Sequence, residues 1–133
     1  MPDIDAHAAY RELLRSHLEA FEDLEILLDV SRPDYRPLGP ADLALHLKLP
    51  EEQVAPAIER LTHTRLLQSV NGLVVLARLD GQTAAGLAEL RRLADVNRAQ
   101  VMADMSTNAI DRLRTGALRA FARAFILKKD SDG

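Results

Sequence analysis

The sequence contains no cysteine among its 133 residues. This absence excludes disulfide bonds, thiolate metal ligands and a cysteine nucleophile, and it is typical of proteins that stay inside the cell. No apolar run approaches the roughly 18 residues that a membrane-spanning helix needs. The first ten residues, MPDIDAHAAY, are acidic and lack the apolar core of a signal peptide. We therefore expect a cytoplasmic protein that makes no contact with a membrane.

An excess of positive charge is also absent, because the formal net charge is −3. The net charge of the whole molecule therefore does not indicate affinity for nucleic acid. The charge is unevenly spread: residues 1–30 hold eight acids and two bases, whereas residues 105–133 hold three acids and six bases. An acidic first segment and a basic last segment could face each other, within one chain or between two.

What is present is a largely helical pattern in one domain. Apolar residues recur at helical spacing over residues 6–31, which fits one long helix or two shorter ones. The prolines of SRPDYRPLGP stop this segment, and Arg36 to Leu38 is expected to be extended. Two short helices follow, the first opening at Gly39-Pro40 and the second after KLP.

The C-terminal part is expected to contain two further helices. The first spans about Ala84 to Met102, and the segment MSTN at residues 105–108 is interpreted as a break. Asn108 is the expected N-cap of the last helix, with Asp111 three residues later, and this helix is expected to end near Leu127.

The stretch SVNGLVV predicts a β-hairpin in the middle of this helical chain. Asn71-Gly72, flanked by β-branched and apolar residues, is the strongest short-range signal for a two-residue hairpin turn, so we expect a hairpin over Leu66–Ala77. Pairing Val70 with Leu73 leaves two largely apolar faces. One face is expected to join the core. The other packs on the protein's own helices or binds a partner. The sequence assigns neither face to the core: one holds Gln68, Val70, Leu73 and Val75, and the opposite one holds Leu67, Ser69, Val74 and Leu76.

The middle of the chain resembles a winged helix-turn-helix. LGPADLALHLKLPEEQVAPAIERLTHTRLL has apolar residues at the positions where that family packs its two helices and enters its first wing strand. With helices on both sides, residues 24–92 resemble the MarR-type arrangement of transcriptional regulators. The resemblance implies one winged-helix domain over residues 1–133, mainly α with one β-hairpin. Its parts are N-terminal helices at 6–31, the helix-turn-helix and wing at 39–77, and C-terminal helices at 82–128.

The resemblance implies that the second short helix meets DNA, although its chemistry departs from the family. The Asp-x-Arg motif of the MarR-type wing is absent, no cation lies between Gln68 and Ala77, and residues 51–64 carry three acids against Arg60. Arg60 is the expected phosphate or guanine ligand. If it paired with an acid of its own chain, the helix would have no cation left for DNA. The candidate DNA contacts are Gln53, Arg60, Thr62, Thr64 and Arg65.

Arg112, Arg119 and Arg123 are expected to form a cationic row, because they fall within roughly 40° of one another on a helix. The N-terminal helix carries the mirror spacing in acids, at Glu12, Glu19 and Asp23. The two rows could be solvated, could meet across a dimer, or the arginines could hold an anion or nucleic acid. Surplus apolar residues at both ends favour a homodimer built from the first helix and the last two. They are Leu13, Leu14, Leu18, Phe21, Leu118, Phe121 and Phe125.

No pattern indicates catalysis. No two of the four histidines are spaced three or four residues apart as a helical metal pair, no glycine-rich phosphate loop occurs, and nothing orients Ser16 or Ser69 as a nucleophile. We expect no enzyme activity, no metal and no cofactor. Three hypotheses follow. The first is a homodimeric transcription regulator that binds double-stranded DNA. The second is a winged-helix adapter that binds protein at its apolar wing and acidic first helix instead of DNA. The third is a ligand-binding or enzymatic pocket between helices.

Overall fold

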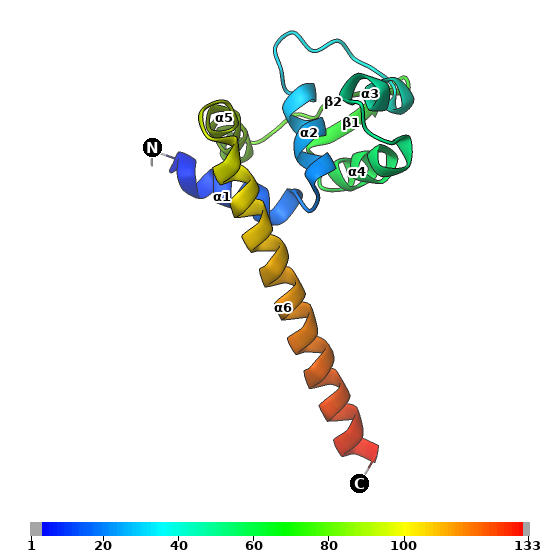
Figure 1. The fold of residues 1–133 in the computed structure, drawn as a ribbon, viewed down its shortest axis with the longest axis vertical. Helices are drawn as coiled ribbons and strands as arrows, with labels where there is room; N and C mark the ends of the chain where they lie inside the picture. Colours follow the sequence, from blue (N-terminus) through cyan, green and yellow to red (C-terminus); the bar gives the residue numbers. More distant parts are fainter. Residues whose placement is uncertain (1–3, 132–133) are drawn as a thin grey trace.

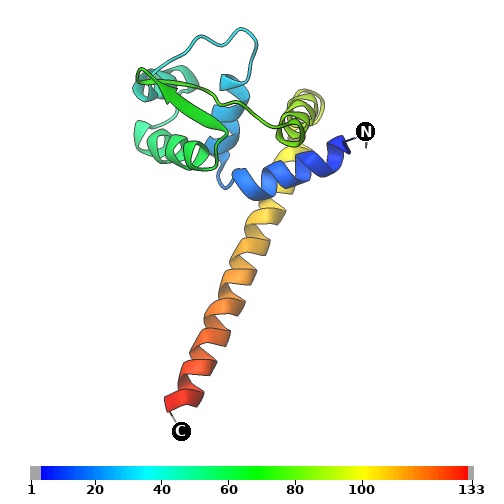
Figure 2. The ribbon, with the colours of Figure 1, turned by 180° about the vertical axis from the view of Figure 1, so that it is seen from behind.

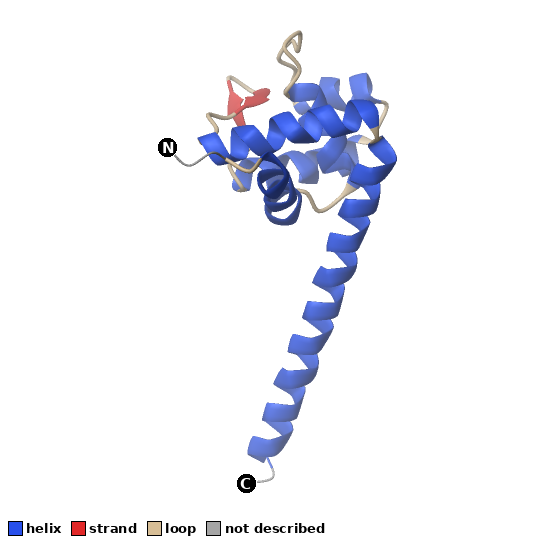
Figure 3. Cartoon of the chain, turned by 90° about the vertical axis from the view of Figure 1, so that its left-hand side faces the viewer, coloured by secondary structure: helices blue, strands red, loops and turns tan. Residues whose placement is uncertain are grey.

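The computed structural model describes residues 4–131, with side chains described as far as Ala124. Within this range the regular structure is six helices and one two-stranded hairpin (Figure 1; Figure 3). The expected class, mainly α with a single hairpin between helices, is confirmed. The elements are α1 (Ala6–His17), α2 (Phe21–Val30), α3 (Pro40–Leu47), α4 (Glu51–His63), β1 (Leu67–Val70), β2 (Leu73–Leu76), α5 (Gly81–Val96) and α6 (Arg98–Ser131).

The N-terminal segment is two helices. The backbone of Leu18 is extended, with φ −108° and ψ 109°, and its N–H still donates to the carbonyl of Leu14. Helix α2 starts afresh after Ala20. Leu18, in the link between the two helices, has its side chain buried in the core.

The hairpin forms with the expected register. Val70 pairs with Leu73 and Gln68 with Val75, and both turn residues have positive φ, 54° at Asn71 and 79° at Gly72. Asparagine and glycine tolerate this left-handed backbone better than other residues, which explains why a helical chain can reverse within two residues here.

The expected extended piece before α3 packs against this hairpin. Leu38 forms an isolated bridge with Val74, whose N–H donates to the Leu38 carbonyl at 2.8 Å. The Tyr35 hydroxyl donates to the carbonyl of Val74 at 2.6 Å and accepts from the N–H of Leu38 at 3.2 Å. The outer edge of β2 is therefore covered, whereas β1 pairs with β2 alone among the described residues.

The predicted break at residues 105–108 is wrong, and so is the prediction of Asn108 as an N-cap. The chain breaks instead at Asn97, whose side chain accepts from the N–H of Gln100 at 3.2 Å, and α6 then runs without interruption. Met105 is buried, and the Thr107 hydroxyl donates to the carbonyl of Ala103, so this polar segment fits within a helix.

Buried side chains from α1, α2, α3, α4, the hairpin, α5 and the start of α6 form the core. Figure 2 shows these elements gathered in one body at one end of α6. Its largest fully buried side chains include Tyr10, Leu14, Leu24, Leu61 and Leu90. Helices α1 and α5 pack especially closely, since a Cβ built on Gly86 would lie 2.5 Å from the carbonyl oxygen of Ala9.

Beyond the body, α6 continues as a projecting helix (Figure 1; Figure 3). Every described residue from Leu113 to Ala124 is exposed. We call residues 113–131 of α6 the arm. Over the described residues, no helix combines the length and the apolar character that crossing a bilayer requires.

Candidate functional site

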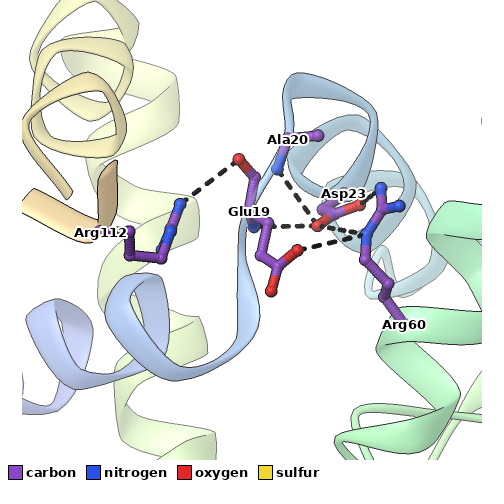
Figure 4. Close-up of polar contacts among 5 residues, drawn as sticks. All are labelled: Glu19, Ala20, Asp23, Arg60 and Arg112. Atoms are coloured by element: carbon purple, nitrogen blue, oxygen red, sulfur yellow. Dashed lines mark hydrogen bonds and ion pairs between the residues drawn. The ribbon is translucent and has the colours of Figure 1, made fainter. Parts of the chain in front are cut away.

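The candidate DNA-reading residue Arg60 is bound to its own chain. Its Nη2 donates to Oδ1 of Asp23 at 2.7 Å, and its Nε lies 3.5 Å from Oδ2 of Asp23 and 4.0 Å from a carboxylate oxygen of Glu19 (Figure 4). The Asp23 carboxylate accordingly raises the pKa of Arg60. Since the Arg60 side chain is only 34% exposed, its charge is largely committed to this contact.

Asp23 can hold this arginine because it stands in the first turn of α2. Its Oδ2 accepts from the N–H groups of Glu19 and Ala20, at 2.9 and 3.2 Å, which would otherwise lack partners at the helix start. The side chain is fully buried. A buried carboxylate needs compensation by charge and hydrogen bonds, and Arg60 together with two backbone donors supplies both.

Arg112 reaches the same linker from α6. Its Nη2 lies 3.4 Å from the carbonyl oxygen of Glu19, and its Nη1 is buried without a hydrogen-bond partner among the described residues (Figure 4). Residues Glu19 to Asp23 are therefore contacted by α4 on one side and by α6 on the other.

The predicted acidic row is wrong, because the chain turns between α1 and α2. Glu12 stays on α1, where it binds Arg15 and the Ser16 hydroxyl, and both contacts lower the pKa of Glu12. Glu19 lies in the linker and Asp23 is buried. These acids share no face that could mirror Arg112, Arg119 and Arg123. Arg112 is half-buried, whereas Arg119 and Arg123 are exposed on the arm.

The remaining candidate DNA contacts are not assembled into one cluster of side chains. The hydroxyls of Thr62 and Thr64 donate to backbone carbonyls one turn earlier, those of Ile58 and Leu61. Gln53 is exposed near the start of α4, and Arg65 is exposed just after its end, with a positive φ of 69°. The exposed acids of α4 are Glu51, Glu52 and Glu59.

The two faces of the hairpin have different environments. Leu67 and Val74 are buried at 1% and 2% exposure, so their face joins the core. On the other face Val70 is 46% exposed and Leu73 is 40% exposed, and Gln68 is exposed too. We call Gln68, Val70, Leu73 and Val75 the outer face of the hairpin. Val75 is partly buried, whereas the other three residues of this face are left exposed by the described part of the chain.

The histidines do not form a metal or catalytic cluster. No group of three or more His, Cys, Asp or Glu residues within the described part of the chain could hold a metal ion. His46, which is more than half exposed, lies 3.3 Å from Oδ1 of the buried Asp29, so it links α3 to α2.

An open groove of about 630 Å³ lies between α1 and the start of α6. Its walls carry both signs of charge, with Arg11 and Arg15 beside Glu12 and Asp104. Asp104 already accepts from the Tyr10 hydroxyl at 2.7 Å and from the Gln100 amide at 2.9 Å. The groove therefore has no set of convergent groups directed at a small molecule.

The sequence reasoning missed Asp23 as the partner of Arg60. One local signal pointed to its role in capping, since an acid three residues after a helix start commonly accepts from the first backbone N–H groups. No family model matches this chain, and no curated protein or solved structure gives a significant match, so its function has to be inferred from its own geometry.

Proposed function

We propose that this chain is a non-enzymatic protein-interaction module of the winged-helix kind, which captures an apolar, extended segment of a partner protein on the outer face of its hairpin. The observation that carries the proposal is that three of the four side chains of this face are apolar and none is charged, with Val70 and Leu73 each at least 40% exposed. Adjacent exposed apolar side chains on a small domain mark interaction sites.

The free edge of β1 supports an extended partner. The edge of β2 is bridged to Leu38, whereas β1 has a neighbour on one side only among the described residues. A segment that added a strand to β1 would gain backbone hydrogen bonds from this edge and specificity from the side chains of the outer face.

The alternative, a DNA-binding transcription regulator, has weaker support from the contacts of α4. A recognition helix needs cations and hydrogen-bond donors that are free to reach phosphates and base edges. Arg60 is held by Asp23, Thr62 and Thr64 donate to their own helix, and the exposed acids of α4 would repel phosphate. The acidic surface instead favours a neutral or basic partner segment.

Selection from a library of random extended peptides displayed on phage tests this proposal. We expect apolar peptides to be enriched and Val70→Glu or Leu73→Glu to weaken their binding by at least about tenfold. The matched control is Leu45→Glu, which places the same charge on an apolar residue of α3 that is 77% exposed.

A salt titration of binding to random duplex DNA tests the alternative function. A module that binds only protein should show no DNA affinity that decreases steeply as the salt concentration rises. Salt-sensitive DNA binding that Arg65→Ala or Arg60→Ala weakens, together with no peptide enrichment, would overturn the proposal in favour of the regulator.

A further inference from the structure

The contacts of Val74 show which backbone groups of the hairpin face outward. Its N–H donates to Leu38 and its carbonyl accepts from Tyr35, so neither group is turned toward β1. Ser69 lies opposite Val74 in the register, and the two therefore form a non-hydrogen-bonded pair of the antiparallel ladder. In such a pair, both residues direct their backbone groups away from each other. The N–H and the carbonyl of Ser69 consequently face the open edge of β1.

The Tyr35 hydroxyl completes the cover over the outer edge of β2. In an ordinary antiparallel bridge, the N–H of Leu38 would donate directly to the carbonyl of Val74. Here that N–H donates to the Tyr35 hydroxyl at 3.2 Å, and the hydroxyl donates to the Val74 carbonyl at 2.6 Å. The other bond of the bridge is direct, from the N–H of Val74 to the Leu38 carbonyl at 2.8 Å. Both outward groups of Val74 are therefore occupied, and a strand that ran along β2 would have to displace this cover.

The covering segment does not offer a good edge of its own. We call residues 35–38 the strap. Pro37 directly precedes the bridging Leu38 and has no N–H, so the strap cannot present a continuous row of donors to a further strand. The strap thus closes this side of the sheet, and the open edge of β1 is left as the side at which a strand can add.

We infer that Tyr35 is a specificity-determining residue: it holds the strap on β2, so that an extended partner segment adds to β1, where the N–H and carbonyl of Ser69 bind it. The inference rests on the proposed function for the nature of the partner, an apolar extended segment. The cover over β2 concerns this chain alone and can be tested without a partner. Proteins commonly protect a strand edge with a covering loop, and here one of the two edges has such a cover.

Amide hydrogen exchange of the full chain tests the cover without a partner. Tyr35→Phe removes the hydroxyl and both of its hydrogen bonds, so we expect the N–H of Val74 to exchange at least about fivefold faster. Ala77 is the internal reference, because its N–H donates at 2.9 Å to Leu66, on the β1 side of the hairpin. Its rate should stay the same. An equal rise at both amides would indicate general destabilisation and would overturn the local role of Tyr35.

Tyr10→Phe is the matched control variant. It also removes one tyrosine hydroxyl, which donates to Asp104 on α6, and it should not change the exchange rate of Val74 relative to Ala77. An unchanged Val74 rate in Tyr35→Phe would show that the strap stays in place without the hydroxyl, and it would overturn the role of Tyr35.

Proline substitution tests the edge at which the partner adds. The N–H of Ser69 points away from β2, so Ser69→Pro removes a donor from the open edge and leaves the ladder to β2 intact. We expect it to weaken binding of a selected apolar peptide at least about tenfold, whereas Ser69→Ala should leave binding unchanged. In the wild type, the same peptide should slow exchange of the Ser69 amide and leave that of Val74 unchanged, which decides the matter even if the proline variant does not fold.

The outcomes separate this inference from the proposed function. If no peptide binds, the proposed function fails and with it the partner at Ser69, while the Val74 exchange rates still decide whether Tyr35 holds the strap. If Val70→Glu weakens peptide binding but Ser69→Pro does not, the outer face captures its partner without strand addition, and only the inference is overturned. Slower exchange at Val74 instead of Ser69 on adding peptide to the wild type would place the partner on β2 and would also overturn it.

Discussion

Arg60 on α4 and Asp23 on α2 form a partly buried ion pair, with Nη2 of the arginine 2.7 Å from Oδ1 of the aspartate. Thirty-seven residues separate them in the chain. The pair joins α4 to α2, so Arg60 contributes to the fold, although the sequence predicted it to be a DNA-reading side chain.

Replacing Arg60 should therefore destabilise the protein. Arg60→Ala leaves the fully buried Asp23 with its backbone donors but without its countercharge, and we expect a loss of about 1–3 kcal/mol. We expect this loss of stability to be smaller than for a fully buried pair, because the arginine side chain is 34% exposed. Urea unfolding followed by circular dichroism measures the change. Arg65→Ala, at an exposed arginine just after the same helix, should change stability by less than about 0.5 kcal/mol. Equal effects of the two substitutions would show that the ion pair contributes little.

The hairpin turn should tolerate glycine but not a β-branched residue at Asn71. The φ of 54° places this residue in the left-handed region, which costs most L-residues roughly 1–2 kcal/mol. We expect Asn71→Val to lower the unfolding free energy by at least about that amount. Asn71→Gly should be close to neutral, because glycine adopts positive φ freely. Thermal unfolding of the two variants measures both effects. An Asn71→Val variant as stable as the wild type would contradict a turn with positive φ at this residue.

The same substitution at two glycines should have opposite effects. A methyl group at Gly86 would lie 2.5 Å from the Ala9 carbonyl oxygen and 2.9 Å from its carbon, both backbone atoms that cannot move aside cheaply. Gly86→Ala should therefore cost roughly 1–3 kcal/mol by separating α1 from α5. At Gly116 no atom lies within 4 Å, so Gly116→Ala should raise helix stability by about 0.5–1 kcal/mol. Melting curves report the first change and far-ultraviolet ellipticity the second. A stabilised Gly86→Ala would be inconsistent with the close α1–α5 contact.

Acidification should destabilise the fold through His17. Burial lowers the pKa of His17 below 6.5, although the carboxylates of Glu12 and Asp80 act in the opposite direction. Between the two pKa values the unfolded chain binds more protons than the folded protein, so stability decreases as pH falls below about 6.5. His17→Gln should reduce the loss of stability between about pH 7.5 and pH 5.5, as measured by urea unfolding at each pH. His63→Gln, which removes an exposed imidazole, is the control variant. An identical pH dependence in the wild type and His17→Gln would exclude this role.

The sequence alone was sufficient to predict the elements whose conformation depends on a few neighbouring residues. Asn71-Gly72 specifies its turn through backbone sterics, and the pairing of Val70 with Leu73 follows from the turn length. Pro40 starts α3 because its fixed φ suits the first helical position. These local preferences, together with apolar spacing, were enough for the overall class and for the order of its elements.

Tertiary structure decided the features that depend on residues far apart in the chain. The break before α6 falls at Asn97, and burial of Met105 keeps the polar segment 105–108 helical, which local propensity could not reveal. Whether Arg60 is free depends on Asp23, and that pairing exists only because α2 and α4 pack together. Spacing indicates which residues share a face of one helix, but the partner of a charged side chain is determined by the packing of separate elements.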